Sequence, residues 1–421
     1  INIQAASLDA QGPVYASTSL TVQTQGALNN QQSLAARDRI NLSSAGQLSN
    51  NGIIEAGVNA DNTRNATGDV SLNGQNLRNA GSVVASRNLD LTSSQSMDNR
   101  GGTLSGQSRI QVNATTLDNR HQGRLLSSDN LTLSASQVLN NQGLINSHGA
   151  LVAQLGYLDN SAGEFSSHAA AYLTVAALDN VAGLLMAGQN LNLLASGAVN
   201  NRNGRLGANQ TLSFTGNTLD NSQRGLLSAG STLDLDLVSL DNRGGQLNGG
   251  AATRLTVTDV LNTQGRIASQ ADLLANISHL SQQGGELVAQ GNLSLSGATL
   301  DNRNGGLVGS AQALSLNVGN VDNRGGELSS AAALSLGGQQ LNNSDGGKLL
   351  AGSDLLLTIR QEINQSQGLI SAKGQATITG QQLDNGGGTL STLSALGIQL
   401  DGALSNLDGL ISSEGTLTVG A

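Results

Sequence analysis

The segment Leu117-Asp118-Asn119 recurs with small variations along the whole chain of 421 residues. Two close copies are Leu158-Asp159-Asn160 and Leu240-Asp241-Asn242. The apolar first residue of each copy, here called the anchor, is followed by the next anchor after 19 to 22 residues, except across one interval of 29. The twenty anchors are Leu8, Leu28, Leu48, Leu77, Met97, Leu117, Leu139, Leu158, Leu178, Val199, Leu219, Leu240, Leu261, Leu280, Leu300, Val321, Leu341, Ile363, Leu383 and Leu404. Self-similarity at such a period is typical of a solenoid of stacked repeats.

Two further positions share this period. The residue two places after the anchor is Asn in 16 of the 20 units, and the exceptions are Ala10, Thr263, Gln282 and Gln365. A Gly follows three to six residues after the anchor in every unit except the one at Leu28. The long interval, between Leu48 and Leu77, contains a polar stretch, which predicts a loop insertion near residues 58–68. We therefore expect a single repeat domain over residues 1–421 with one inserted loop.

Short apolar alternation between Gly and Asn turns predicts β-strands in every unit. We expect three short strands per unit: an alternating piece such as Leu131-Thr132-Leu133, the Leu-Asp-Asn piece, and the piece after the Gly turn. Twenty residues are too few for two packed helices, and leucine-rich repeats are the structural alternative because they share this length. Their pattern requires Asn three residues after the Leu-x-Leu pair, where this sequence has Ser136. The fold class predicted is all-β, a parallel β-helix of about 20 turns of about 20 residues, roughly 95 Å long at the usual strand spacing.

Side chains alternate between the two faces of a strand, so Leu117 and Asn119 should point inward while Asp118 points outward. An inward Asn on successive turns can form a ladder of amide hydrogen bonds that also satisfies backbone groups. The predicted structural ladder consists of Asn99, Asn119, Asn141, Asn160, Asn180, Asn201, Asn221, Asn242, Asn302, Asn323, Asn343 and Asn385.

Composition excludes several other classes of protein. Aromatic residues are only 1% of the chain, whereas ordinary cores and ligand pockets use them for buried area. The absence of Cys excludes disulfides and Cys-ligated metals, and the single Pro excludes collagen. The net charge of −9 argues against nucleic acid as a partner, and no apolar stretch is long enough for a membrane span. The chain begins at Ile1 without a signal pattern, as expected of a mature protein or an excised fragment.

The stretch Val321-Asp322-Asn323-Arg324-Gly325-Gly326-Glu327-Leu328-Ser329 resembles the haemagglutinin repeats of filamentous-haemagglutinin-like exoproteins. Variants occur at Met97–Ser105 and Leu240–Leu247, and the resemblance covers essentially the whole chain. It implies a right-handed parallel β-helix fibre, secreted or attached to the outer surface of a Gram-negative bacterium. An outer-membrane transporter of two-partner secretion exports such proteins, which act as adhesins or as shafts of contact-dependent growth-inhibition effectors. No secretion domain or toxin domain of that family is recognisable in this sequence.

Candidate chemistry is sparse, and we predict no catalytic residue, no cofactor and no metal site. The acidic residues are spread one per unit, whereas a carbohydrate-active β-helix enzyme needs clustered carboxylates in a cleft. Calcium requires six to eight oxygen ligands, which one outward Asp per unit does not supply. His148 and His168 fall three residues after equivalent apolar positions and could stack on neighbouring turns. They are either a two-His metal or partner patch or solvated turn residues.

The outward Asp positions follow a pattern of their own. Asp98 with Asp118, Asp159 with Asp179, Asp220 with Asp241, and Asp301 with Asp322 should occupy neighbouring turns. We expect the next turn after each pair to carry Asn instead, at Asn140, Asn200, Asn262 and Asn342. Two unit charges 4.8 Å apart in water repel by about 0.9 kcal/mol. Arg100, Arg120, Arg243, Arg303 and Arg324, each two residues beyond an Asp, should offset part of this repulsion.

The function predicted is that of a non-enzymatic fibrous shaft that presents a distal adhesive or toxin segment away from the producing cell. Its expected partners are the outer-membrane transporter and a receptor on a target or host cell. The first alternative is an adhesin whose β-helix face itself binds host glycan or protein. The weaker alternative is a carbohydrate-active β-helix enzyme.

Overall fold

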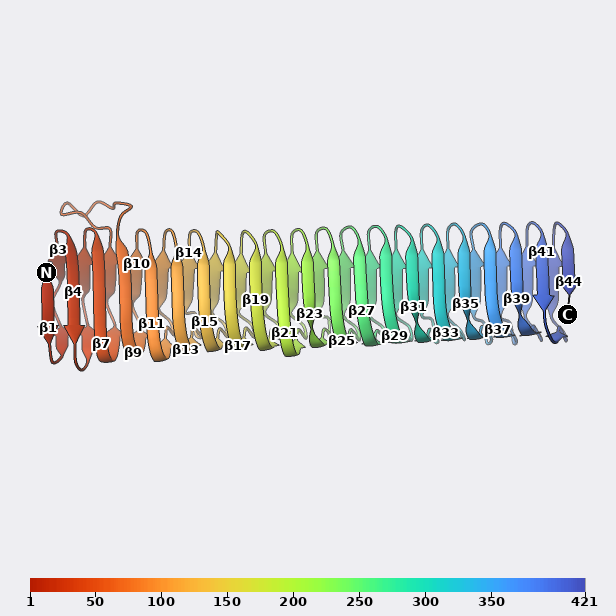
Figure 1. Ribbon diagram of the computed structural model, residues 1–421, viewed down its shortest axis with the longest axis horizontal. Coiled ribbons are helices and arrows are strands. Elements are labelled where there is room, and N and C mark those ends of the chain that lie inside the picture. Colours follow the sequence, from red (N-terminus) through yellow and green to blue (C-terminus); the bar gives the residue numbers. More distant parts are fainter. Residues whose placement is uncertain (421) are drawn as a thin grey trace. The chain divides into compact units, whose positions relative to one another are not determined.

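The computed structural model describes residues 1–420, which are all-β and contain no helix. The chain divides into two compact units, Ile1–Gln210 and Thr211–Ala421. Within each unit the strands are paired in parallel, turn upon turn, in a β-solenoid, and the two units together contain about 21 turns (Figure 1). The predicted fold class is confirmed. None of the described residues forms a helix that could cross a membrane.

The first two turns of unit 1 each contain three strands, as predicted. These strands are β1 (Asn2–Ala5), β2 (Leu8–Ala10), β3 (Val14–Ala16), β4 (Ser19–Thr24), β5 (Leu28–Asn30) and β6 (Ser33–Ala36). Each later turn of unit 1 contains one long and one short strand. The long strands are β7 (Arg39–Asn50), β9 (Asp69–Asn79), β11 (Leu89–Asp98), β13 (Ile110–Asp118), β15 (Leu131–Leu139), β17 (Leu151–Asp159), β19 (Ala171–Asp179) and β21 (Leu191–Asn200). The short strands are β8 (Ile53–Ala56), β10 (Ser82–Ala85), β12 (Thr103–Gly106), β14 (Arg124–Ser127), β16 (Leu144–Ser147), β18 (Glu164–Ser167), β20 (Leu184–Ala187) and β22 (Arg205–Ala208).

Unit 2 repeats the arrangement of one long and one short strand per turn. Its long strands are β23 (Leu212–Asp220), β25 (Leu233–Asp241), β27 (Thr253–Leu261), β29 (Leu273–Ser281), β31 (Leu293–Asp301), β33 (Leu314–Asp322), β35 (Leu334–Asn342), β37 (Leu355–Ile363) and β39 (Ala376–Asp384). Its short strands are β24 (Leu226–Ala229), β26 (Gln246–Gly249), β28 (Arg266–Ser269), β30 (Glu286–Ala289), β32 (Leu307–Ser310), β34 (Glu327–Ser330), β36 (Lys348–Ala351), β38 (Leu369–Ala372) and β40 (Thr389–Thr392). The remaining strands are β41 (Leu396–Leu400), β42 (Leu404–Ser405), β43 (Leu410–Ser413) and β44 (Leu417–Gly420).

The expectation of three strands in every turn is therefore wrong for most of the chain. Strand β15 contains both the Leu131-Thr132-Leu133 piece and the anchor, because Ala135-Ser136-Gln137 between them stays extended. Residues of this stretch pair with the turns on both sides, for example Ala135 with Ala114 and with Leu155. This stretch contains no Gly or Asn that would form a turn. Pairing with the neighbouring turns therefore keeps it extended, and the two expected strands become one.

The core of each unit is a set of inward columns of aliphatic side chains. Leu131, Leu133 and Val138 of β15 are all buried, and the residues between Leu131 and Leu133 and on either side of Val138 are more exposed. In the short strands, Ile145 lies in register with Phe165, which packs in the same aliphatic column. Burying side chains of this size stabilises the coil by roughly 1.5–3 kcal/mol each.

Strand register corrects three of the predicted anchors. Val138, and not Leu139, lies in register with Leu117 and Leu158. Val260 replaces Leu261 in the same way, between Leu240 and Leu280. Glu362 replaces Ile363, between Leu341 and Leu383. In all three turns the chain places an Asn in the inward position two residues later: Asn140, Asn262 and Asn364. Placement of the Asn, more than the apolar character of the anchor, therefore decides the register.

The inserted loop lies between β8 and β9 and comprises residues 57–68 (Figure 1, the loop above the first turns). An antiparallel bridge joins Val58 to Arg64, and the backbone N–H of Asn65 donates to the carbonyl of Gly57 at 2.9 Å. Strand β8 still pairs with β10 residue for residue, from Ser82 with Ile53 to Ala85 with Ala56. The insertion thus leaves the stacking of the turns unchanged.

Candidate functional site

A line of amide side chains, buried except at Asn406, runs inside each unit and is here called the amide column. In unit 1 it consists of Asn30, Asn50, Asn79, Asn99, Asn119, Asn140, Asn160, Asn180 and Asn201, and in unit 2 of Asn221, Asn242, Asn262, Gln282, Asn302, Asn323, Asn343, Asn364, Asn385 and Asn406. The Nδ2 of Asn140 donates to the Oδ1 of Asn160 at 2.7 Å, and Asn160 donates in the same way to Asn180 at 2.7 Å. Asn160 is therefore both donor and acceptor in this line, which requires a regular stack of turns.

Most of these amides also donate to a backbone carbonyl of the next turn. The Nδ2 of Asn160 donates a second hydrogen bond to the carbonyl of Leu184 at 3.0 Å. Gly163 makes this close packing possible, because a Cβ there would lie 2.1 Å from the carbonyl oxygen of Asn140 and 2.9 Å from the Oδ1 of Asn160. The left-handed backbone of the turn belongs to the preceding residue, Ala162, with φ of 51°. Gly163 is thus needed for close approach and not for a positive φ.

Eleven of the twelve predicted ladder residues lie in the amide column, and Asn141 does not. Asn141 is half-buried outside the column, where Asn140 takes its place. The cause is that Val138, and not Leu139, is the anchor of this turn, so each inward position lies one residue earlier than predicted. Sequence reasoning also missed Asn262 and Asn364 for the same reason. The spacing of the anchors could have revealed such a shift. With Leu139 as anchor the intervals to its two neighbours are 22 and 19 residues, and with Val138 they become 21 and 20.

The column is interrupted at one position in unit 2. The Nδ2 of Asn262 donates to the Oε1 of Gln282 at 3.2 Å, but the Nε2 of Gln282 turns to the carbonyl of Leu307 at 2.7 Å. The Oδ1 of Asn302 consequently has no hydrogen-bond partner although it is buried. The Gln282 side chain is longer than Asn, so its amide nitrogen lies beyond the Oδ1 of Asn302, which an Asn at this position would reach.

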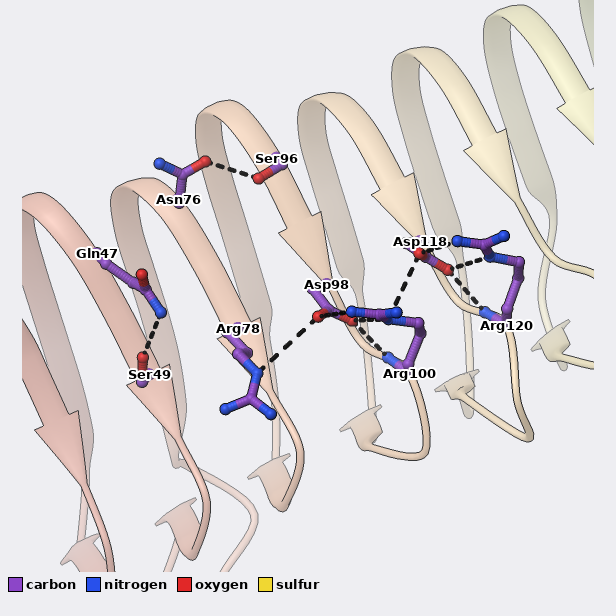
Figure 2. A network of polar contacts seen from close by, with 9 residues as sticks. All are labelled: Gln47, Ser49, Asn76, Arg78, Ser96, Asp98, Arg100, Asp118 and Arg120. Atoms are coloured by element: carbon purple, nitrogen blue, oxygen red, sulfur yellow. Dashed lines mark hydrogen bonds and ion pairs between the residues drawn. The ribbon is translucent and has the colours of Figure 1, made fainter.

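The residue before each amide-column residue points outward, and these positions are here called the outer column. Figure 2 shows a charged part of it, with Arg78 on β9, Asp98 on β11 and Asp118 on β13. Arg100 forms two hydrogen bonds to Asp98, at 2.9 and 2.8 Å, and its Nε lies 3.5 Å from the Oδ2 of Asp118 on the next turn. Arg78 and Arg120 extend the row on either side. The Arg100 hydrogen bonds hold the pKa of the Asp98 carboxyl below its usual value, against the opposing effect of partial burial.

The remaining predicted Arg residues form the same pairs. Arg243, Arg303 and Arg324 each donate from Nε and Nη2 to the Asp two residues earlier. The expected Asn after each Asp pair is wrong in two cases. Leu139 follows Asp118 and Leu261 follows Asp241 in the outer column, while Asn140 and Asn262 are buried in the amide column. Asn200 and Asn342 do follow Asp179 and Asp322.

The pair Asp159 and Asp179 has hydrogen-bond donors of a different kind. The hydroxyl of Tyr157 donates to the Oδ2 of Asp179 at 2.6 Å, and the Nδ2 of Asn200 donates to its Oδ1 at 3.1 Å. Burial, and next the Asp179 hydrogen bond, raise the pKa of the Tyr157 hydroxyl. The backbone N–H of Ser161 donates to Asp159 at 3.0 Å. Asp179 thus accepts from the turns on both sides, whereas Asp159 accepts from its own turn.

One ionisable side chain lies inside the coil. Glu362 is only 2% exposed, and neither of its carboxyl oxygens has a hydrogen-bond partner. It occupies the anchor position between Leu341 and Leu383, and burial raises its pKa to about 8. The group is therefore protonated at neutral pH, because an unpaired buried charge would be costly.

The two His residues singled out from the sequence are in contact. The rings of His148 and His168 are stacked with centroids 4.2 Å apart and an interplanar angle of 17°. Both side chains are exposed, and they follow β16 and β18 on neighbouring turns. Among residues 1–420, no group of three or more His, Asp and Glu side chains is arranged to hold a metal ion.

Comparison with known proteins agrees with this architecture. The family model for the haemagglutinin repeat matches residues 1–52, 55–101, 103–239, 203–276, 237–297, 288–359 and 353–421. No curated protein and no solved structure gives a match. The matched segments cover nearly all of the chain, which confirms the resemblance inferred from the Asp-Asn-Arg-Gly-Gly motif. The chain belongs to the haemagglutinin repeat family.

Proposed function

We propose that this chain is a fibrous, non-enzymatic shaft of a secreted or surface-attached bacterial exoprotein. It would hold a distal adhesive or toxin segment away from the producing cell. The observation that carries the proposal is the amide column, which joins almost every turn of each unit to the next through buried hydrogen bonds. Stability in such repeats is a sum of nearest-neighbour terms, so a shaft can be lengthened by adding turns.

Membership in the haemagglutinin repeat family indicates an extracellular or surface exoprotein with a structural or adhesive role. The carboxylates support a structural role as well. Those in the outer column are spread along it, and they accept from Arg side chains, from backbone N–H groups of their own turn or, at Asp179, from Tyr157 and Asn200. As the export partner we propose an outer-membrane transporter of two-partner secretion, with the chain displayed by a Gram-negative cell.

The shape of the purified chain tests the shaft proposal directly. Small-angle scattering and negative-stain electron microscopy should show a particle several times longer than wide, with β-rich circular dichroism. A compact globular particle would contradict the proposal. The enzymatic alternative is tested on the same sample: cleavage of a polysaccharide panel that disappears with a single Asp substitution would overturn the non-enzymatic assignment.

A specific observation favours the adhesin alternative. Tyr172 on β19 and Leu194 on β21 are about half exposed on the outer side of unit 1, and Val152 on β17 lies in register with Tyr172. Exposed apolar side chains that gather in this way can contact a partner surface. If the face itself binds cells, Tyr172→Ser combined with Leu194→Ser should abolish the binding. Val238→Ser, at an equally exposed apolar position on β25, should leave it unchanged.

The export proposal has its own test. The complete gene should produce cell-surface protein, detected by antibody on intact cells, only when the adjacent transporter gene is expressed. Surface display without any transporter would contradict the proposed export partner and leave the shaft proposal to the shape measurement.

A further inference from the structure

A cavity of about 690 Å³ lies where the inserted loop folds over the first turns of unit 1. Its floor is formed by the starts of β4 and β7 and by the turns before them, with Ser19 and Asn41 among the lining residues. Asn59, Asn65 and Thr67 of the loop form the opposite wall. The volume falls within the range of small-molecule sites. The repeat pattern is thus broken in the same place where a cavity forms.

The loop is held in place by several contacts. The Nδ2 of Asn65 lies 3.0 Å from both the carbonyl oxygen of Arg37 and the Oδ1 of Asn59. The hydroxyl of Tyr15 donates to the carbonyl of Val58 at 3.2 Å, and the Nη2 of Arg64 donates to Glu55 at 3.0 Å. These contacts come from both ends of the loop and from two neighbouring turns, so the cavity wall is already formed without a ligand.

Positive charge is concentrated in this cavity. Its lining includes three Arg residues, Arg37, Arg39 and Arg87, but only one acidic residue, Asp38. Arg37 pairs with Asp38 at 3.1 Å, and Arg87 donates to Asp69 at 2.8 Å. Even with Asp69 included, three guanidinium groups face two carboxylates, in a chain whose net charge is −9.

Arg39 is the least engaged of the three cations. Within residues 1–420 its only ion pair is a contact of 3.8 Å to Asp69, and Arg87 already holds that carboxylate through Nε and Nη2. More than half of the Arg39 side chain is exposed. A guanidinium with two or more free N–H groups is suited to bind a carboxylate or phosphate through paired hydrogen bonds.

We propose that this cavity binds an anionic sugar: Arg39 would contact the carboxylate or phosphate group, and Asn41, Asn59 and Thr21 would contact the hydroxyl groups. Amide and hydroxyl side chains both donate and accept hydrogen bonds, as sugar hydroxyls do. The site is independent of the shaft proposal, because it depends on the inserted loop and not on the stacked turns.

The test uses the whole chain and isothermal titration calorimetry with glucuronate, glucose 6-phosphate, glucose and acetate as probes. Glucuronate or glucose 6-phosphate should bind, and the difference between them identifies the preferred anion. Raising the salt concentration from about 0.02 to about 0.5 M should weaken binding, because exposed charges are screened. Glucose binding as tightly as glucuronate would overturn the role of the charge, and acetate binding as tightly would overturn the role of the sugar.

Two variants locate the site. Arg39→Gln should weaken binding of the anionic sugar at least ten-fold. Arg109→Gln should leave it unchanged; Arg109 is similarly exposed, precedes β13 and pairs with Asp90 outside the cavity. A further variant that replaces residues 58–67 by a short Gly-Ser turn should also lose binding while keeping the circular dichroism of the parent chain. Unchanged binding by Arg39→Gln or by this loop variant would overturn the proposal, as would no binding of either anionic sugar to the parent chain.

Discussion

The amide column and the outer column differ by one position in the sequence. The residue type hardly changes from turn to turn in the amide column, but it varies widely in the outer column. In the amide column every member but Gln282 is Asn. In the outer column Asp118 is followed by Leu139 and then by Asp159, and Ser281 and Ile363 occur further along. A buried amide must find both a donor and an acceptor within the protein, whereas an outward side chain can use water. Burial therefore restricts the residue type in the amide column, whereas many residue types are accepted in the outer column.

Glu362 shows how strongly the inner column constrains the chain. Shifting this turn by one residue would expose the carboxyl and bury Ile363, but it would also remove Asn364 from the column. The chain instead buries Glu362 without a hydrogen-bond partner, and the Nδ2 of Asn364 donates to Asn385 at 2.7 Å. Retaining the amide, with its several hydrogen bonds, outweighs the cost of one buried protonated carboxyl.

The largest expected effect is the pH dependence of unfolding around Glu362. The unfolded carboxyl has its ordinary pKa of 4.5, and the folded one has a pKa of about 8. Between these values the folded state keeps a proton that the unfolded state releases. The contribution of Glu362 to the free energy of unfolding should therefore be fully present below pH 4.5 and should decrease as pH rises to 8, by up to about 1.4 kcal/mol per pH unit. Urea unfolding at several pH values measures this slope.

Two variants separate ionisation from polarity at this position. Glu362→Leu should remove the slope and stabilise the protein at pH 8, because it restores the aliphatic column between Leu341 and Leu383. Glu362→Gln should remove the slope but leave a buried polar group. A slope between pH 4.5 and 8 that persists in both variants would show that another group causes it.

The next largest effect is expected from Asn160→Leu, which keeps similar bulk but removes the amide. The Nδ2 of Asn140 then loses one of its two acceptors, and the Oδ1 of Asn180 and the carbonyl of Leu184 lose the Asn160 donor. Leaving buried groups unpaired costs about 1–3 kcal/mol. Since stability in a repeat is local, amide hydrogen exchange should accelerate in β15, β17 and β19 and remain unchanged in β7 and β9. Unaltered exchange in all of these strands would refute the structural role of the amide column.

A smaller and opposite effect is expected from Gln282→Asn. The shorter side chain should reach the Oδ1 of Asn302, which has no partner in the parent chain, and so complete the column within unit 2. A net gain of about 1 kcal/mol in the free energy of unfolding is expected for one added hydrogen bond. Slower exchange in β29 and β31 would accompany it. A loss of stability would mean that the Gln282 bond to the Leu307 carbonyl outweighs the missing link.

Much of this architecture could be predicted from residue patterns. Alternation within Leu131-Thr132-Leu133 and the regular spacing of the anchors suffice for a coil of parallel strands. Register failed where two adjacent residues could both serve as anchor, as at Val138 and Leu139, because local apolar character does not distinguish them. Glu362 was beyond prediction, since only the stacking of Asn364 on its neighbours explains why a carboxyl is buried. The Arg39 cavity depends on how the inserted loop folds back, which a repeat pattern does not encode.

The smallest effect is expected at Asp159, the outer neighbour of Asn160. Asp159→Ala removes one hydrogen bond, from the backbone N–H of Ser161, in a turn where water can replace the acceptor. It should change the free energy of unfolding by about 0.5 kcal/mol or less, as for most surface sites. Asp159→Asn keeps the acceptor and should have no measurable effect. Because Asp159 and Asn160 are adjacent in one turn, hydrogen exchange in β15, β17 and β19 compares the two columns in the same surroundings. If Asp159→Ala opened these strands more than Asn160→Leu did, the outer column would be the one that holds the turns together, and the contrast between the two columns would be reversed.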